Sequence, residues 1–366
     1  MKTCYWLLQN AETGSTYAEA AAYIQQGEVV AFPTETVYGL GANGLNEEAV
    51  AKIFAAKGRP NDNPLILHIA SLADIEPLTT GLNANAKALA EAFWPGPLTL
   101  VVNKSEIVPD AVSAGLPTVA VRFPGNKYAQ EFIKACGCPI AAPSANLSGR
   151  PSPTNAQDVL EDMQGKIAGI LDGGSCDIGV ESTIVDTTES VPTILRPGGI
   201  TYEMLTEVLG FVEIDKGLLD DKNFKPKAPG MKYRHYAPKA SMYLLEGKAC
   251  ACLVPLVEAA LRSHKKVGVL CSEAKAACLT QAGEGELLLS TWKTREELAA
   301  ELFYLLRDFD RTCPDIILAE GVEEDGLGLA IMNRMRKAAG YQELVWQEGS
   351  CCLKSGAALP DFVQSL

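Results

Sequence analysis

Lys57 and Arg59 stand two residues apart at the end of a predicted helix, in the turn Lys57-Gly58-Arg59-Pro60. Basic residues at a helix C-terminus often only offset the helix dipole. Here the turn continues into Asn61-Asp62-Asn63-Pro64 and then into a strand, which would fix both side chains beside a strand edge. A lysine point charge and an arginine fork in that position suit a triphosphate. The pair therefore predicts a binding site for a phosphorylated ligand.

A second polar group follows the preceding strand. Val29–Phe32 is wholly apolar and should be buried on both faces, and Pro33 ends it. The next residues, 34–41, supply two threonine hydroxyls, a carboxylate and glycines where open α/β sheets bind ligands. Threonine and glycine are also common in ordinary turns. On these eight residues alone, the ordinary turn is favoured.

Two polar side chains lie inside apolar strands. His68 falls in the predicted strand 65–70, and a lone histidine in a strand is more often a core residue than a functional one. Arg122 lies between apolar residues of the strand 118–124. Because an arginine buried without a partner is costly, Arg122 should face an anion, a carboxylate side chain or solvent at a sheet edge.

Further strands end in polar residues in the same way. The segments 144–149, 172–174, 179–186 and 196–199 each follow or enclose a predicted strand. One such ending is ordinary, but five or more in roughly two hundred residues indicate loops that converge on one crevice. Helices at 46–56, 84–93, 127–135, 155–163 and 202–209, with strands at 98–102 and 139–142, would hold these loops in place.

Length and charge limit the class of protein. A chain of 366 residues, 47% hydrophobic and 21% charged, predicts two globular domains with real cores. The formal net charge of −13 argues against a protein that coats nucleic acid non-specifically, since that binding depends on Lys and Arg. It leaves room for a local basic pocket.

The N-terminus and the cysteines predict a cytoplasmic protein without a membrane anchor. The first apolar run is too short for a signal peptide, and no stretch approaches the length of a membrane span. The eleven cysteines never form CxxC and lie mostly in apolar segments, as reduced thiols do. With only three histidines, a histidine-based metal site is not expected.

The composition changes after residue 212, and we expect domains at 1–212 and 240–348, a linker at 213–239 and a peripheral, loosely packed tail at 349–366. Residues 215–238 alternate lysines, prolines and aromatics without a helical or strand period. Beyond residue 240, strands and helices alternate, which predicts a small Rossmann-like, doubly wound α/β domain.

The polar motifs, taken together, resemble a known family. FPTETVYGLG, KGRP followed by NPLILHI, WPGPLTLV, the Arg122 strand, APSANLSG, GVESTIVD and LRPGG are similar to the YrdC-type threonylcarbamoyl-AMP synthases over residues 13–210. The later GMKYRHYAP and the further domain resemble the long, two-domain members. The resemblance implies a twisted, mixed α/β sheet with a positively charged central cavity.

The resemblance also implies a reaction and a set of site residues. L-Threonine, bicarbonate and ATP, with Mg²⁺ carried by ATP and not by side chains, would give threonylcarbamoyl-AMP and pyrophosphate. Other proteins would then transfer the threonylcarbamoyl group to the adenosine beside the anticodon of tRNA. Carried over by motif, the catalytic pair is Lys57 and Arg59. The ATP contacts are Lys57, Arg59, Asn63, Thr118, Ser144, Asn146, Ser152, Arg196 and Tyr236, and the threonine contacts are Thr36, His68, Arg122, Ala142 and Ser182. The linker would close over the cavity, with Tyr236 near the nucleotide.

This chemistry needs no enzyme nucleophile, because cations and positioned donors can stabilise the charge of an adenylation. We therefore expect threonine's own amine to attack, and no convincing Ser-His-Asp or Cys-His arrangement opposes this view. The rival class is an RNA-binding module for tRNA or double-stranded RNA, and a weak tRNA contact is compatible with either function. The charge of −13 and the lack of a basic-aromatic stripe in the main domain favour the enzyme. A carbamoyl-phosphate-using transferase would need zinc-finger or acylphosphatase domains that the cysteine spacing and length do not provide.

Overall fold

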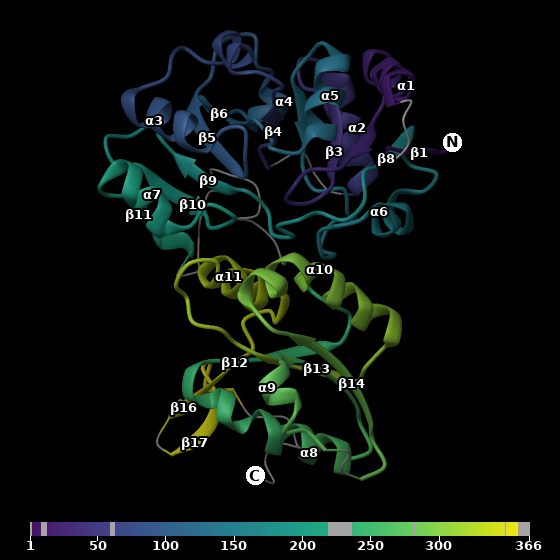
Figure 1. Cartoon of the computed structure of the whole chain (residues 1–366), viewed down its shortest axis with the longest axis vertical. Helices are drawn as coiled ribbons and strands as arrows, with labels where there is room; N and C mark the ends of the chain where they lie inside the picture. Colours follow the sequence, from purple (N-terminus) through teal and green to yellow (C-terminus); the bar gives the residue numbers. More distant parts are fainter. Residues whose placement is uncertain are drawn as a thin grey trace. The chain divides into compact units, whose positions relative to one another are not determined.

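The computed structural model describes residues 2–8, 13–58, 63–218, 236–280, 283–347 and 349–357. The chain forms two compact units, coloured along the sequence in Figure 1. The first contains residues 1–148 and 152–233, and the second contains residues 149–151 and 234–366. Among the helices of the described ranges, none combines the length and the apolar character that crossing a bilayer requires.

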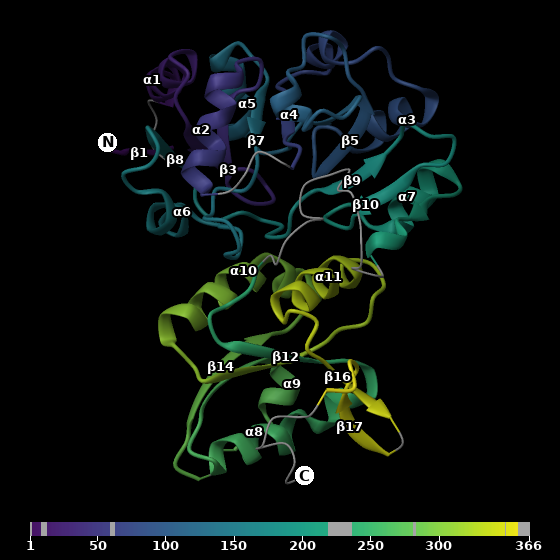
Figure 2. The same ribbon diagram turned by 180° about the vertical axis from the view of Figure 1, so that it is seen from behind.

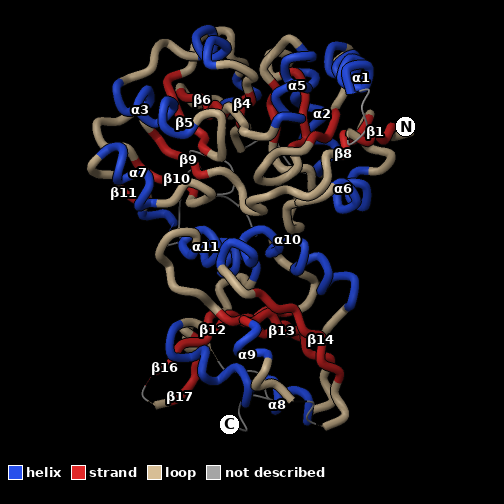
Figure 3. The backbone as a smooth tube through the Cα atoms, viewed as in Figure 1, coloured by secondary structure: helices blue, strands red, loops and turns tan. Residues whose placement is uncertain are grey.

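The first unit is built on a mixed sheet. Its strands, as far as the structure describes them, run in the order β1-β8-β2-β3-β7-β4-β6-β5-β9-β10-β11 (Figure 3). Parallel and antiparallel neighbours alternate irregularly, since β4 and β6 are parallel whereas β5 and β6 are antiparallel. The predicted twisted mixed sheet is confirmed. The strands are β1 Cys4–Leu7, β2 Val30–Phe32, β3 Gly39–Asn43, β4 Ile66–His68, β5 Leu98–Asn103, β6 Thr118–Arg122, β7 Ile140–Ala142, β8 Gly169–Asp172, β9 Thr183–Asp186, β10 Thr193–Arg196 and β11 Glu213–Ile214.

Helices cover this sheet in pairs, with α1 beside α5 and α3 beside α7 (Figures 1 and 2). The helix α2 shows how the sequence sets its ends. The Asn46 side chain accepts the Ala49 N–H at the start, and Gly58 ends the helix at φ 67°, a left-handed conformation that favours glycine. The helices are α1 Thr13–Gln25, α2 Glu47–Lys57, α3 Ala84–Phe93, α4 Asp110–Ser113, α5 Lys127–Cys136, α6 Ala156–Met163 and α7 Tyr202–Leu209, with 3₁₀ turns η1 Leu72–Leu78 and η2 Lys216–Leu218.

The strand β2 lies in the middle of the core. Val30 and Phe32 pack into an apolar cluster with α1 and α5, whereas Ala31 packs into a second cluster with Ile53 of α2. Alternate residues of a strand point to opposite faces, so a fully apolar strand can fill two cores. The prediction that Val29–Phe32 is buried on both faces is confirmed, and this burial fixes the turn that follows it.

The second unit is a smaller α/β domain. Its described strands run in the order β14-β13-β15-β12-β16-β17, and all pairs except β16–β17 are parallel. The helices α10 and α11 lie on one face, with α8 and α9 on the other, as a doubly wound fold requires (Figure 1). The elements are β12 Ser241–Leu245, η3 Gly247–Cys252, α8 Leu253–Arg262, β13 Lys266–Ser272, α9 Glu273–Ala276, β14 Glu286–Trp292, α10 Arg295–Thr312, β15 Ile316–Glu320, α11 Gly328–Ala338, β16 Glu343–Gln347 and β17 Ser350–Leu353.

Two predicted boundaries are corrected. The tail 349–366 is not peripheral throughout, because β17 pairs with β16 and Leu353 packs against the core of the second unit. The predicted linker 213–239 begins with regular structure, since β11 pairs with β10. Most of that linker, residues 219–235, lies outside the described residues.

Candidate active site

The turn after β2 holds the guanidinium of Arg122. Arg122 Nη2 donates to Glu35 Oε1 at 2.7 Å, and Nη1 donates to Thr36 Oγ1 at 2.9 Å. The backbone N–H groups of Gly125 and Asn126 donate to the same Glu35 carboxylate at 3.0 and 3.2 Å. Arg122 is only 3% exposed. Of the three surroundings that the sequence allows for this arginine, the structure shows a carboxylate side chain.

Glu35 is ionised in these surroundings. Burial by itself would raise the pKa of its carboxyl, but the charge of Arg122 and the Gly125 N–H outweigh burial and hold the pKa below its ordinary value. Glu35 is therefore a fixed counter-charge. The sequence places a carboxylate in this turn but does not identify Arg122 as its partner.

His68 lies beside Arg122, because the two residues are paired in the register of β4 and β6. Its Nδ1 is 3.2 Å from the Ile66 carbonyl oxygen, and its ring meets Phe32 edge-on at 5.8 Å between centroids. Burial and the charge of Arg122 lower the pKa of His68 to about 3. His68 is therefore a neutral imidazole at physiological pH, and the carbonyl oxygens of Ile66 and Ile140 are the two backbone acceptors for its single N–H.

Ser182 and Arg196 form a second group beyond β5, where β9 begins and β10 ends. Arg196 Nε donates to the Ser182 carbonyl oxygen and Nη2 donates to Ser182 Oγ, both at 3.0 Å. Ser182 Oγ also shares a hydrogen bond of 2.8 Å with Thr99 Oγ1. Thr99 is paired with Arg122 across β5 and β6, so it stands between the two arginine groups in the sheet. Sequence reasoning missed Thr99; the only signal was a hydroxyl inside an apolar strand.

Lys57 holds the turn that follows β7. Its Nζ donates to the carbonyl oxygens of Ser144 and Asn146 at 2.5 and 2.7 Å, and lies 3.4 Å from Asn146 Oδ1. Ser144 Oγ donates to that same Oδ1 at 2.5 Å. The structure therefore brings these three predicted ATP contacts together. Arg59, the other half of the predicted catalytic pair, lies outside the described residues.

Asn63 is the most unusual of the predicted contacts. It is 0% exposed, yet neither its Nδ2 nor its Oδ1 has a hydrogen-bond partner. Buried amides are almost always paired, because a lost hydrogen bond inside a protein is costly. This fully buried, unpartnered amide is therefore a candidate ligand contact.

The remaining predicted contacts are spread along the first unit, apart from Tyr236. Ser152 Oγ donates to Glu181 Oε1 at 2.7 Å, and Glu181 is a buried carboxylate that sequence reasoning gave no role. Ala142 pairs with Ile66 of β4. Thr118 begins β6 whereas Arg122 ends it, which separates them by about 13 Å along the strand. Tyr236 belongs to the second unit, where its ring stacks on Phe303 at 4.9 Å.

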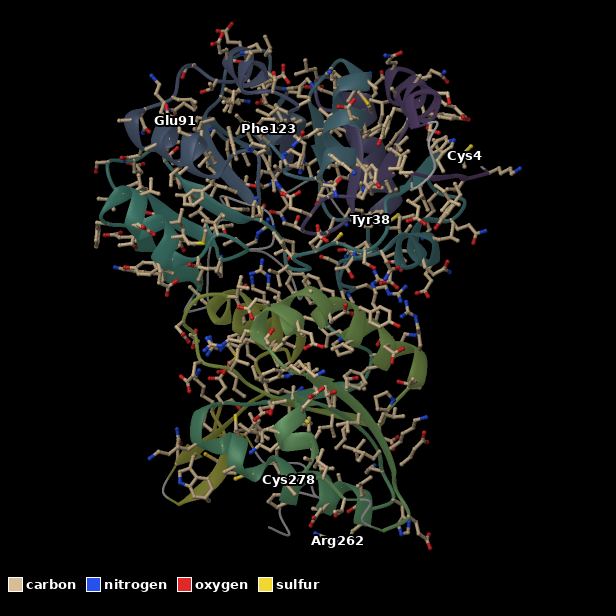
Figure 4. All side chains as sticks on the ribbon, viewed as in Figure 1. Cys4, Tyr38, Glu91, Phe123, Arg262 and Cys278 are labelled. Atoms are coloured by element: carbon tan, nitrogen blue, oxygen red, sulfur yellow. The ribbon has the colours of Figure 1, made fainter. Side chains whose placement is uncertain are left out.

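The interior near the site offers donors and cations and no activated nucleophile among the described residues. Cys176 is buried next to the Thr34 backbone, and burial raises the pKa of its thiol, which keeps it protonated. Tyr38, labelled in Figure 4, is fully buried and donates to the Gly174 carbonyl oxygen at 2.7 Å. No cluster of His, Cys, Asp or Glu that could hold a metal occurs in the described part of the chain. The arrangement suits charge stabilisation and ligand positioning.

Known proteins match this chain over most of its length. A family model described as telomere recombination matches residues 22–198, and one described as threonylcarbamoyl-AMP synthase, C-terminal domain, matches residues 200–340. The threonylcarbamoyl-AMP synthase of Pyrococcus abyssi is 52% identical over 326 residues, 88% of this chain and 94% of the relative. That of Bacillus subtilis is 48% identical over 347 residues, 93% of this chain and 99% of the relative.

A solved structure agrees over almost the whole chain. The crystal structure of P. abyssi Sua5 complexed with L-threonine has a TM-score of 0.87 and 48% identity, and the match covers 95% of this chain and 100% of that one. Both the first unit and the second therefore have counterparts in these relatives. The chain belongs to the threonylcarbamoyl-AMP synthase family, in its two-domain form.

Proposed function

We propose that this chain forms L-threonylcarbamoyladenylate and pyrophosphate from L-threonine, bicarbonate and ATP. Family membership supports the reaction, and the L-threonine in the crystal structure of the P. abyssi relative supports the amino acid. The observation that carries the proposal is the row formed by His68, Arg122 and Thr99, which joins the Glu35–Thr36 turn to the Ser182–Arg196 pair. This row offers donors and acceptors for an amino acid, and it lies next to a second cation, Arg196.

In this proposal the threonine carboxylate binds Arg122. The Nε–H of Arg122 is buried and has no hydrogen-bond partner, so the guanidinium still has a donor to offer. Thr36 is bonded to Arg122, His68 is paired with it in the register, and Ser182 is bonded to Arg196; these three residues would meet the amine and hydroxyl of the same ligand. Ala142, on the strand β7 that adjoins His68, would line the pocket through its backbone.

ATP would occupy the region of Lys57, Ser144 and Asn146. The nucleotide would take Lys57 Nζ as a phosphate partner, and it would pair the unpartnered amide of Asn63. Arg196 and Ser152 would add contacts on the phosphate and nucleotide sides. Thr118 would contact the same nucleotide, because Ile66 pairs with both Ala120 and Ala142 and the start of β6 is therefore level with the turn after β7.

The reaction follows from positioning. The neutral amine of threonine attacks CO₂ formed from bicarbonate, or bicarbonate itself with loss of water, and gives a carbamate. A carbamate oxygen then attacks the α-phosphorus of ATP. The bond between the α-phosphorus and the oxygen that bridges it to the β-phosphorus breaks, and pyrophosphate leaves. Lys57 and Arg196 would offset the charge that develops on the phosphates. The protonated thiol of Cys176 and the neutral ring of His68 agree with a route that modifies no side chain.

Mg²⁺ fits this site as an ion carried by ATP. The described residues contain no group of carboxylates, histidines or cysteines that could hold a metal, and the Glu35 carboxylate is already held by Arg122 and two backbone N–H groups. Bound to the phosphates, the ion would offset the negative charge of the leaving pyrophosphate. The product would pass to proteins that transfer the threonylcarbamoyl group to tRNA, and a weak direct tRNA contact belongs to the same proposal.

Incubation of the full chain with ATP, Mg²⁺, bicarbonate and one amino acid at a time tests the function. We expect strong pyrophosphate release with threonine alone, and a product with the mass of threonylcarbamoyl-AMP. Omission of bicarbonate is the control that separates this reaction from simple ATP hydrolysis. Release that ignores the amino acid or bicarbonate would contradict the proposal. A salt-sensitive tRNA shift with no pyrophosphate release would favour the RNA-binding alternative instead.

A further inference from the structure

We propose that Thr34 and Glu35 are positioning residues for the amino acid: they fix Thr36 as a hydrogen-bond acceptor and Arg122 as a donor toward the substrate. The inference rests on the proposed function and adds two residues to the site. Neither residue is among the ligand contacts predicted from the sequence, and both are buried directly after β2.

The position of one proton follows from the contacts of Thr34. Its Oγ1 lies 2.6 Å from the Val37 carbonyl oxygen, which can only accept, so Thr34 donates its single hydroxyl proton there. The same Oγ1 lies 2.9 Å from Thr36 Oγ1. Because the Thr34 proton is already used, the proton in this second hydrogen bond comes from Thr36. The N–H groups of Thr36 and Val37, both at 3.2 Å, share the second lone pair of the Thr34 oxygen.

Thr36 is left with acceptor capacity only. Its proton goes to Thr34, and one of its two lone pairs accepts from Arg122 Nη1 at 2.9 Å. The remaining lone pair can meet only a donor on the ligand, such as an amine or a hydroxyl. The hydrogen bonds all run in one direction, from Arg122 through Thr36 and Thr34 to the Val37 carbonyl. In the contact with the ligand, Thr36 is therefore the acceptor and the ligand is the donor.

Glu35 fixes the other half of the pocket. Its carboxylate takes Nη2 of Arg122 and is itself held by the N–H groups of Gly125 and Asn126. With Nη1 on Thr36 and Nη2 on Glu35, the guanidinium plane cannot turn, and its buried Nε–H keeps one direction. That N–H can meet only an acceptor, such as a carboxylate.

The donor on Arg122 and the acceptor on Thr36 match the two ends of an α-amino acid. The charge of Glu35 also offsets that of Arg122, so the pair receives a zwitterion without gathering a net positive charge. The pocket is thereby set to select a ligand with a carboxylate beside an amine or hydroxyl. Reversal of the Thr36 hydroxyl would place a donor where the ligand also presents a donor.

The variant Thr34→Val tests the hydroxyl chain, because valine has nearly the same shape as threonine and no hydroxyl. We expect the Kd for L-threonine, measured by calorimetry, to rise about tenfold while the Kd for ATP changes by less than about twofold. Thr34→Ser restores the hydroxyl and should bring threonine affinity back. Wild-type threonine affinity in Thr34→Val would overturn the proposal. So would equal losses in the valine and serine variants, or a loss of ATP affinity of the same size.

Glu35→Gln tests the second residue, and a rise of at least about tenfold in the KM for threonine with a smaller change in kcat is the expected result. An unchanged KM would remove Glu35 from the proposal. If this variant does not fold, the Thr34 pair still decides. The wild-type protein distinguishes failure of the proposed function from failure of the positioning role. If wild type shows no threonine-dependent pyrophosphate release, the proposed function is refuted. If wild type releases pyrophosphate normally and Thr34→Val binds threonine as wild type does, only the positioning role is refuted.

Discussion

His68 provides a measurable test of the electrostatics of the site. Burial and the neighbouring Arg122 lower its pKa from 6.5 to about 3 in the folded protein. At pH 5, about 1% of this imidazole should therefore carry a proton, whereas an unfolded chain would have protonated it almost completely. The folded state thus excludes a proton that the unfolded state binds.

The sign and size of the effect on stability follow from this difference. As the pH falls below 6.5, the unfolded state gains protons that the native state does not, so the free energy of unfolding decreases. At higher pH the full stability is present. Between pH 7 and pH 5, His68 alone should cost about 2 kcal/mol of unfolding free energy. Comparison of wild type with His68→Gln by urea unfolding at the two pH values isolates this share.

Nuclear magnetic resonance of histidine-labelled protein measures the pKa directly. The chain has three histidines, so His235→Gln and His264→Gln assign the His68 signal by elimination. We expect the His68 signal to keep the chemical shift of a neutral ring from pH 8 to pH 5. A signal that titrates above pH 5 would refute the reasoning, because it would mean that burial and Arg122 do not act on this ring as the structure indicates.

Three further variants test other parts of the site. Lys57→Ala should lower kcat/KM for ATP by tenfold or more, which corresponds to the loss of about one charge-assisted hydrogen bond. Lys52→Ala, on the exposed side of the same helix, serves as the control. Normal product formation by Lys57→Ala would exclude Lys57 from the site. Asn63→Leu should raise the unfolding free energy without ligand by about 1–3 kcal/mol, because it removes an unpaired buried amide, and should weaken ATP binding; a variant that is less stable and still binds ATP normally would contradict this. Glu35→Gln should lower the unfolding free energy at pH 7 by about 3–5 kcal/mol, since Arg122 loses its buried partner. Because the pKa of Glu35 is lowered in the folded protein, the stability that Glu35 contributes is lost as the pH falls below about 4.5. In urea unfolding, the difference in unfolding free energy between wild type and Glu35→Gln should therefore become smaller in acid. A difference that grows in acid would contradict this reasoning.

Much of the local structure could be predicted from the sequence because local physics decides it. The apolar run Val29–Phe32 can only be a strand buried on both faces, and Asn46 with Gly58 sets both ends of α2. The single crevice predicted from the polar residues at the strand ends stays a prediction. The tail could not be predicted in this way, because the pairing of Leu353 with β16 depends on a neighbour and not on its own short sequence.

The partners inside the site depend on distant pairings. The strand β4 lies between β7 and β6, neither of which is its neighbour along the chain, so no local pattern places His68 beside Arg122. The hydrogen bond between Glu35 and Arg122 joins residues 87 positions apart, and that between Thr99 and Ser182 joins residues 83 apart. Sequence alone could say that a buried arginine needs an anion. It could not choose between a ligand and Glu35. The structure shows that Glu35 accepts from Nη2 of Arg122, while Nε of Arg122 has no partner.

The unpaired atoms of the site show how folding and binding are linked in this protein. Arg122 Nε and both polar atoms of Asn63 are buried without partners, and each such group costs about 1–3 kcal/mol relative to a paired one. Arg122 ends β6, and Asn63 stands just before β4, the strand paired with β6, so both costs fall on one pair of strands. A ligand that supplies an acceptor to Arg122 and a donor and an acceptor to Asn63 would recover them. The same strands should therefore be least stable without substrates and gain most when threonine and ATP bind.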